Sequence, residues 1–247
     1  AHGMASVFQQ RASDLRGILN GCDYQDWDPA FDPLLPATYD ADHLAGKHTC
    51  KRALQQETGL PVGNLPIYGM VCRLTEQKGV HLLIPALDKF LQHQVQVVIV
   101  GSGDPSLAAQ LQTIAQQHPD RFAFINAYDD RLAHLVEAGA DFFLMPSLFE
   151  PCGLNQMYSL AYGTLPLVRA VGGLKDTVVD WDADPARATG FCFNDPTAST
   201  LLDAMRRSLL HYLQDPERFA RVQQSAMHTR FDWADSVPLY EQMYQDA

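Results

Sequence analysis

Short apolar runs alternate with amphipathic segments from residue 67 to residue 193, and this alternation restricts the fold more than any other feature of the chain. The runs predict strands at 67–72, 95–100, 122–125, 142–145, 165–168 and 190–193. The segments between them predict helices at 80–91, 107–117, 130–138, 154–162 and 174–179. Strands that alternate with helices favour a parallel sheet with right-handed crossovers. We therefore predict an α/β fold with an open, doubly wound, Rossmann-like sheet.

The two ends of the chain follow a different pattern. Residues 6–15 predict a short helix, residues 17–19 predict a short strand, and Asn20-Gly21 predicts a turn. Residues 22–38 are irregular and contain several prolines and aspartates, which indicates a wrapping loop or linker. The remaining helices are expected at residues 41–57, 198–214, 216–229 and 234–245.

Composition and charge exclude several classes of protein. With 18 Lys and Arg against 29 Asp and Glu, the chain has a net charge of −11, which argues against broad contact with nucleic acid or an anionic membrane. No apolar run approaches a membrane span, and no signal peptide is visible. The five cysteines form no CxxC pair and indicate reduced thiols in a cytosolic protein. The nine histidines show no HExxH-like spacing, so we expect no required metal and no cofactor.

Unusual residues follow the predicted strands. Because parallel strands end along one edge of a sheet, the loops after them converge there, and crevices at that edge are the usual ligand sites. The converging segments are 73–79, 101–104, Tyr128, 147–153 and 170–173.

Arg73 and Lys78 lie on one such loop, just before a predicted helix. A guanidinium fork, an ammonium group and free helix N–H groups together suit a diphosphate. The alternative is a pair of solvated surface charges. The position of both residues on a strand-end loop favours phosphate binding.

Glu150 directly follows an apolar strand and is flanked by Pro151 and Gly153. A carboxylate there favours a functional role over its alternative, an ion pair that ties two loops together. Cys152 is expected to fill space rather than to act as a nucleophile, since no histidine is close in sequence. With the basic loop and the Gly172-Gly173 pair, these residues predict a site for a nucleotide-linked sugar.

Three further features each allow two interpretations. Gly101-Ser102-Gly103 begins a dinucleotide fingerprint but lacks the third glycine, so a tight turn capped by Asp104 or Ser106 competes with it. Tyr128 either stacks on a base or plugs the edge of the core, and the core interpretation leads. Gly172-Gly173 either opens a phosphate-binding helix or forms an ordinary turn.

Several motifs in a fixed order resemble those of the bacterial glycogen synthase and plant starch synthase family. The motifs are Arg73-Leu74-Thr75-x-Gln77-Lys78-Gly79, Glu150-Pro151-Cys152-Gly153-Leu154-Asn155-Gln156, and Tyr162-Gly163-Thr164-Leu165-Pro166 followed by Gly172-Gly173-Leu174. The resemblance extends over nearly the whole chain. It implies a GT-B glycosyltransferase that transfers glucose, with retention, from ADP-glucose to the non-reducing 4-hydroxyl of an α-1,4-glucan.

The resemblance also implies roles for single residues. Arg73 and Lys78 would stabilise the leaving diphosphate, Tyr128 would stack on adenine, and Glu150 would contact the donor glucose. The pocket for glucose and the distal phosphate would be lined by Cys152, Gly153, Leu154 and Asn155, with Gly172 and Gly173 beside them. Related glycosyltransferases carry a second glutamate eight positions after the first, whereas this chain has Tyr158 there.

The chain resembles only the C-terminal half of that family. Residues 1–38 would then be the hinge and a wrapping loop, residues 39–230 the donor-binding domain, and residues 231–247 a helix that crosses back to an N-terminal domain. Most contacts to the glucan acceptor would come from that other domain. The location would be the bacterial cytoplasm, or a plastid for a plant-type enzyme. The alternatives are a related enzyme that uses a UDP-sugar and a nucleotide-sugar-binding module without turnover.

Overall fold

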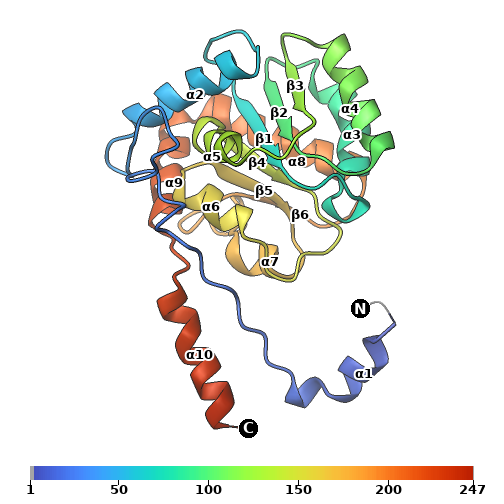
Figure 1. Ribbon diagram of the computed structural model, residues 1–247, viewed down its shortest axis with the longest axis vertical. Coiled ribbons are helices and arrows are strands. Elements are labelled where there is room, and N and C mark those ends of the chain that lie inside the picture. Colours follow the sequence, from blue (N-terminus) through green and yellow to red (C-terminus); the bar gives the residue numbers. More distant parts are fainter. Residues whose placement is uncertain (1–2, 247) are drawn as a thin grey trace.

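A single parallel sheet forms the centre of the molecule in the computed structural model, which describes residues 3–246 (Figure 1). Its strand order is β3-β2-β1-β4-β5-β6. The strands are β1 (Ile67–Val71), β2 (Gln96–Val100), β3 (Phe122–Ile125), β4 (Phe142–Met145), β5 (Leu165–Arg169) and β6 (Phe191–Phe193). The order reverses between β1 and β4, which is the switch point where doubly wound sheets bind their ligands.

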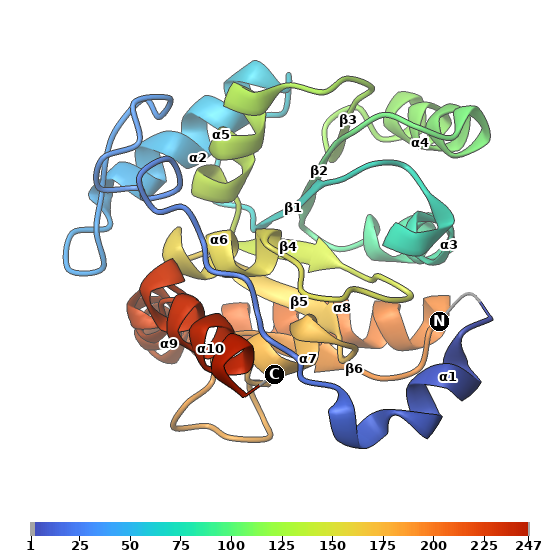
Figure 2. The ribbon, with the colours of Figure 1, turned by 60° about the horizontal axis from the view of Figure 1, so that its bottom comes forward.

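Helices cover both faces of this sheet (Figure 2). One face carries α3 (Val80–Phe90), α4 (Pro105–Gln117) and α8 (Ala198–Gln214). The other face carries α2 (Ala45–Glu57), α5 (Asp130–Gly139), α6 (Asn155–Ala161) and α7 (Gly173–Thr177). The α9 helix (Pro216–His228) packs against both α6 and α8.

The strands are buried on both sides because their side chains alternate between two hydrophobic cores. In β2, Val97 and Ile99 enter the core under α3 and α8, whereas Val98 and Val100 enter the core under α5. This explains why the strands appear in the sequence as continuous apolar runs. The predicted α/β fold is confirmed, and its strands and helices between residues 67 and 228 lie within about two residues of the expected bounds.

Two expectations for the first residues are wrong. Residues 17–19 form no strand, because no backbone ladder reaches them; the backbone pairing starts only at Cys22, whose N–H donates to Phe231 O over 2.7 Å. The helix expected at 6–15 is split into α1 (Ala5–Gln10) and a 3₁₀ turn, η1 (Ala12–Asp14). A second 3₁₀ turn, η2 (Glu76–Lys78), precedes α3.

The N-terminal segment and α10 (Trp233–Gln245) project from the body of the molecule (Figure 1). They are tied to each other: Ser236 Oγ donates to Leu19 O over 2.8 Å, and Arg16 pairs with Asp246 over 2.7 Å. Within residues 3–246, no helix has the length and apolar character that crossing a bilayer requires.

Candidate active site

The loops after the parallel strands enclose a cavity of about 280 Å³ at the carboxyl edge of the sheet. Four of the predicted binding or catalytic residues line it: Arg73 and Lys78 from the loop after β1, Tyr128 from the loop after β3, and Asn155 from the start of α6. These residues are far apart in sequence and meet because all the strands run in the same direction.

Lys78 and Glu150 form an ion pair across two of these loops. Lys78 Nζ lies 2.7 Å from Glu150 Oε2, and Ser147 Oγ donates to the same oxygen over 3.2 Å. The ion pair that the sequence offered as the alternative for Glu150 therefore exists. It does not remove Lys78 from the ligand side, since Lys78 also lines the cavity. The pair places one cation and one carboxylate at the same edge, while the guanidinium of Arg73 is exposed at the same cavity.

Hydrogen bonds to the backbone of Leu148 fasten the loop after β4 to its neighbours. Leu148 N–H donates to Gln77 O over 2.8 Å, and Arg169 Nη1 donates to Leu148 O over 3.1 Å. Gly79 adopts a φ of +73°, and a Cβ there would lie 2.0 Å from Pro146 O, so a side chain at this position would force the two loops apart. The position of Glu150 is thus fixed by the surrounding backbone.

The Gly172-Gly173 pair packs directly against the Glu150 loop. A Cβ on Gly172 would lie 2.0 Å from Glu150 O, and one on Gly173 would lie 2.1 Å from Cys152 O. The N–H of Gly173 donates to Glu150 O over 3.1 Å. These glycines are therefore needed for close approach of two loops. They do not line the cavity, and neither do Cys152, Gly153 and Leu154, so the predicted sugar-binding role of all five stays a prediction.

Asn155 makes a structural hydrogen bond and also lines the cavity. Its side-chain Nδ2 donates to Val71 O over 3.0 Å, which ties the start of α6 to the end of β1, and the residue also lines the cavity. Asn155 is the member of the Cys152–Asn155 motif that the structure brings to the cavity wall.

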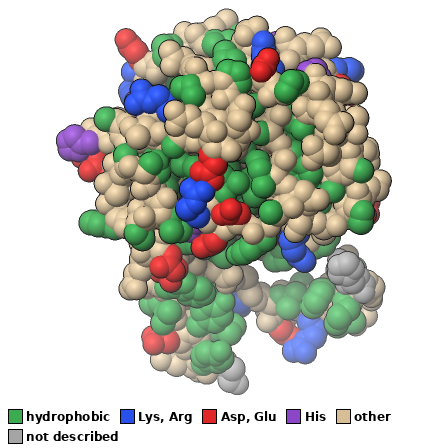
Figure 3. Space-filling view, turned by 45° about the horizontal axis from the view of Figure 1, so that its top comes forward, with side chains coloured by type: hydrophobic (Ala, Val, Ile, Leu, Met, Phe, Trp, Pro, Cys, Tyr) green, Lys and Arg blue, Asp and Glu red, His purple; other side chains and the backbone are tan. Residues whose placement is uncertain are grey.

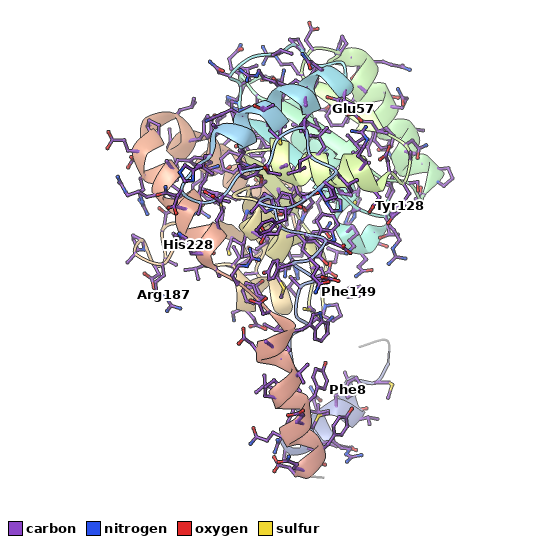
Figure 4. All side chains as sticks on the ribbon, turned by 60° about the vertical axis from the view of Figure 1, so that its left-hand side comes forward. Phe8, Glu57, Tyr128, Phe149, Arg187 and His228 are labelled. Atoms are coloured by element: carbon purple, nitrogen blue, oxygen red, sulfur yellow. The ribbon has the colours of Figure 1, made fainter. Side chains whose placement is uncertain are left out.

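Tyr128 is 89% exposed and lines the cavity. Figure 4 shows it at the surface of the domain. The interpretation that it plugs the core is wrong, because the chain between β3 and α5 turns outward and carries the ring to the surface. An exposed aromatic ring at a cavity is available for stacking on a base.

The Gly101-Ser102-Gly103 sequence is a packing turn. A Cβ on Gly101 would lie 1.9 Å from Cys72 O, and one on Gly103 would lie 2.4 Å from Leu74 O. The alternative with Asp104 as a helix cap is confirmed, since its Oδ1 accepts from Ser106 N and Leu107 N over 2.8 and 3.1 Å. Gly101 and Ser102 nevertheless form part of the cavity wall.

The cavity residues that the sequence analysis did not single out include Trp27, Glu137 and the acidic pair Asp129 and Asp130. Trp27 belongs to the wrapping loop and is stacked between His134, at 3.7 Å between ring centroids, and Tyr158, at 4.3 Å. The local sequence does not predict these contacts, because they join positions far apart in the chain. Glu137 was detectable, because it is the acidic residue within the apolar run from Leu135 to Ala140.

A buried polar network holds the wrapping loop against α5 and α6. Asp32 Oδ2 lies 2.8 Å from His134 Nδ1 and accepts a hydrogen bond from Tyr162 Oη over 2.6 Å. Burial alone would raise the pKa of Asp32, but hydrogen bonds from His134, Tyr162 and a backbone N–H outweigh it and lower that pKa. Asp32 therefore stays ionised inside the protein and fixes the loop that carries Trp27.

Basic and acidic side chains gather in the middle of the face shown in Figure 3, beside hydrophobic ones. Within residues 3–246, no group of three or more His, Cys, Asp or Glu side chains is arranged to hold a metal ion. The cavity lining supplies cations, hydrogen-bonding groups, an aromatic ring and the carboxylates of Asp129 and Asp130.

The sequence profile of the family described as glycosyl transferases group 1 matches residues 52–226. The chain belongs to this glycosyltransferase family. It is 87% identical, over its whole length, to a glycogen synthase of Aeromonas hydrophila and 60% identical to a glycogen synthase of Vibrio parahaemolyticus. It covers 51% and 52% of those proteins, so it spans about half the length of the curated relatives it matches.

Solved structures of glycosyltransferases have the same architecture. The catalytic domain of starch synthase IV from Arabidopsis thaliana, bound to ADP and acarbose, superimposes with a TM-score of 0.93 at 36% identity, over 99% of this chain and 51% of that one. HepE of Anabaena, in complex with UDP and glucose, superimposes with a TM-score of 0.69 at 20% identity, covering 98% of this chain and 60% of its own. The second likeness shows the fold alone. Together these neighbours identify the sheet as the Rossmann-like half of a GT-B glycosyltransferase.

Proposed function

We propose that this glycosyltransferase chain is the donor-binding half of a glycogen synthase. It binds ADP-glucose and, with an N-terminal half, transfers glucose to the non-reducing 4-hydroxyl of an α-1,4-glucan with retention. The observation that carries the proposal is the meeting of Arg73, Lys78 and Tyr128 at one cavity. The two cations suit a diphosphate and the ring suits a base, and the two together are the parts of a nucleoside diphosphate.

The residues also suit the chemistry. When the bond between the sugar and the diphosphate breaks, negative charge grows on the leaving phosphate, and fixed cations lower the energy of that state. Arg73 and Lys78 supply those cations. Positive charge grows on the sugar ring at the same time, and the carboxylate of Glu150 stabilises it. The ion pair with Lys78 orients the carboxylate of Glu150 before the donor arrives.

The remaining motif residues complete the donor site in this proposal. Asn155 already lies at the cavity, and Cys152, Gly153 and Leu154 immediately precede it on the same loop. With Gly172 and Gly173 packed against that loop, these residues surround the glucose and the distal phosphate once the donor is bound.

The proposal extends to the parts of the chain. Residues 39–230 form the donor-binding domain, residues 1–38 the hinge and wrapping loop, and residues 231–247 a helix that packs against the N-terminal half. That half supplies most contacts to the glucan acceptor. We place the enzyme in the bacterial cytoplasm, since the curated relatives that it matches are bacterial glycogen synthases.

Calorimetric titration of this chain with ADP and with UDP tests the proposal. We expect ADP to bind and UDP to bind more weakly. Lys78→Ala should weaken ADP binding about 10-fold, because a charge-assisted contact to phosphate is lost. Lys89→Ala, which removes an exposed lysine of α3 outside the cavity, is the control and should change nothing. Tighter binding of UDP would assign the chain to an enzyme that uses a UDP-sugar.

A further inference from the structure

Glu137 is a carboxyl group buried at the wall of the cavity. The residue is 1% exposed, it comes from the third turn of α5, and it lines the cavity together with Trp27 and Asn155. A buried acidic side chain is uncommon, and this one pairs with no Arg or Lys side chain among residues 3–246. The protonation state of Glu137 is therefore the question that its surroundings must answer.

A protonated Glu137 satisfies both short contacts of Ser159 at once. Ser159 Oγ lies 2.7 Å from Asn155 O and also 2.7 Å from Glu137 Oε2. A hydroxyl group has one hydrogen, and a backbone carbonyl has none to give. If Ser159 donates to Asn155 O, the short contact to Glu137 requires a hydrogen on Oε2, which then donates to Ser159 Oγ.

Burial acts in the same direction. It raises the pKa of Glu137 well above its ordinary value, and the opposing effects of the Ser159 hydrogen bond and the Lys47 charge are smaller. A neutral acid at this wall also favours an anionic ligand, since one more carboxylate, beside those of Asp129 and Asp130, would further repel a bound diphosphate.

With Oε2 bonded to Ser159, the other oxygen of Glu137 is left for the cavity. Oε1 has no hydrogen-bond partner within the described part of the chain. In a protonated carboxyl group this oxygen is a carbonyl-type acceptor. The cavity wall therefore offers one buried acceptor, and leaving it unpaired after a ligand has excluded water would weaken binding.

We propose that Glu137 Oε1 accepts a hydrogen bond from the nucleoside of the bound nucleotide, either from a ribose hydroxyl or from the amino group of the base. This inference rests on the proposed function. A diphosphate at Arg73 and Lys78 places the nucleoside toward the α5 side of the cavity, where Tyr128 and Glu137 both lie. Glu137 is then a determinant of nucleotide specificity, distinct from the groups that bind phosphate.

Two substitutions separate this role from a structural one. Glu137→Gln reproduces the donor and acceptor pattern of the protonated acid: its Nε2 donates to Ser159 and its Oε1 faces the cavity. Glu137→Met keeps the length of the side chain but removes both polar atoms. We expect calorimetry on this chain to give ADP affinity within about 2-fold of wild type for the glutamine variant and about 10-fold weaker for the methionine variant.

Analogues identify the partner group. ADP is compared with 2′-deoxy-ADP, 3′-deoxy-ADP and inosine diphosphate, in which a carbonyl replaces the amino group. The analogue that lacks the donor to Glu137 should bind wild type weakly and should lose no further affinity in Glu137→Met. Thermal unfolding of each variant confirms that it is folded; if the methionine variant fails to fold, the analogue series on wild type and Glu137→Gln decides.

The outcomes are distinct. If wild type does not bind ADP, the proposed function fails. If wild type binds ADP but the folded methionine variant binds equally well, or if all analogues bind like ADP, the role of Glu137 is overturned. If Glu137→Gln loses affinity as strongly as Glu137→Met, the protonated state is overturned.

Discussion

Glu150 is a single charged residue placed where two loops meet, and the structure gives it two contacts that matter: Lys78 Nζ at 2.7 Å and Ser147 Oγ at 3.2 Å. Since the surrounding backbone fixes the loop, changing this side chain alters charge more than shape. That makes it suitable for separating the binding of the nucleotide from the transfer of the sugar.

We predict that Glu150→Gln lowers the turnover of the complete enzyme by about 100-fold or more, because the carboxylate no longer stabilises charge in the transition state. ADP binding should not weaken, since Lys78 is released from its ion pair and remains free to bind phosphate. Steady-state kinetics with ADP-glucose and glycogen, together with ADP titration, measure both. Glu76→Gln, an exposed acid on the neighbouring loop, serves as the control. Unchanged turnover would remove Glu150 from the mechanism.

Glu137 also predicts a pH dependence of stability. Its pKa in the folded protein lies well above the ordinary value of 4.5, so the folded state holds a proton that the unfolded state has already released. Stability is therefore lost as pH rises from that ordinary value toward the folded pKa, by up to about 1.4 kcal/mol per pH unit. Glu137→Gln cannot release a proton and should lack this loss.

Urea unfolding of wild type and Glu137→Gln between pH about 5 and about 7 measures the difference, which should grow with pH. The titratable groups facing Glu137 do not interfere in that range: the pKa of Lys47 is lowered by burial only to about 8, and burial raises those of the surrounding tyrosines, Tyr39, Tyr158 and Tyr162. A constant difference across the range would mean that Glu137 is ionised in the folded protein.

At the scale of elements, the wrapping loop is the least expected part of the molecule. It contributes Trp27 to the cavity, and the Asp32 network anchors it to α5 and to the end of α6. The loop is thus a wall of the site, although its sequence has the composition of a linker. We therefore expect the packing of this loop to stabilise the fold only while Asp32 is ionised.

We predict that Asp32→Asn lowers the free energy of unfolding by about 1–3 kcal/mol at neutral pH, because the buried His134 and Tyr162 lose their ionised partner. The folded pKa of Asp32 lies below its ordinary 3.8, so wild type holds this stability above that value and loses it as pH falls through the folded pKa. The variant should therefore approach wild type in acid. Urea unfolding against pH measures this, with Asp42→Asn, an exposed aspartate, as the control. An equal loss of unfolding free energy at all pH values would contradict the conclusion that Asp32 acts as an ionised partner of His134 and Tyr162.

The contact between the N-terminal segment and α10 depends on Gly21. A Cβ at this position would lie 2.4 Å from Trp233 N and 2.5 Å from its Cα. Gly21→Ala should therefore push the two segments apart and speed amide hydrogen exchange in α10. Gly17→Ala is a matched control, since a Cβ at Gly17 meets nothing within 4 Å. Unchanged exchange in the Gly21 variant would show that the two segments do not depend on close packing.

The sequence predicted those features that depend on local pattern. The strands and helices around the sheet follow from apolar runs and their spacing, and the convergence of Arg73, Lys78 and Glu150 follows from parallel strands. Long-range contacts were not predictable in this way. Trp27 contacts side chains of α5 and α6, which follow it by more than a hundred residues, and Tyr128 is turned outward by a loop whose path has no sequence signal.

On the scale of the whole molecule, the projecting segments expose large apolar side chains. Trp233, Val237, Leu239 and Tyr244 of α10 are between 44% and 74% exposed, and Phe8 of α1 is 44% exposed. Figure 3 shows hydrophobic side chains over both projecting segments. Exposed apolar side chains grouped in this way mark contact surfaces. The chain also spans only about half the length of its curated relatives.

We therefore predict that this chain alone produces little or no glucan from ADP-glucose and glycogen, while still binding ADP. Adding the N-terminal half of a relative, expressed separately or fused, should restore synthesis. Incorporation of labelled glucose into glycogen measures it. Robust synthesis by the chain alone would contradict the proposal that an N-terminal half is needed to supply the contacts to the glucan acceptor.

The strand order has a consequence for biosynthesis. β1 lies in the middle of the sheet, yet one of its two neighbours, β4, is made only after two more strands and three helices have left the ribosome. Until then the nascent chain carries an open hydrogen-bonding edge beside uncovered apolar side chains, a state prone to aggregation. Newly made molecules should depend on chaperones during that interval, long before any substrate is present.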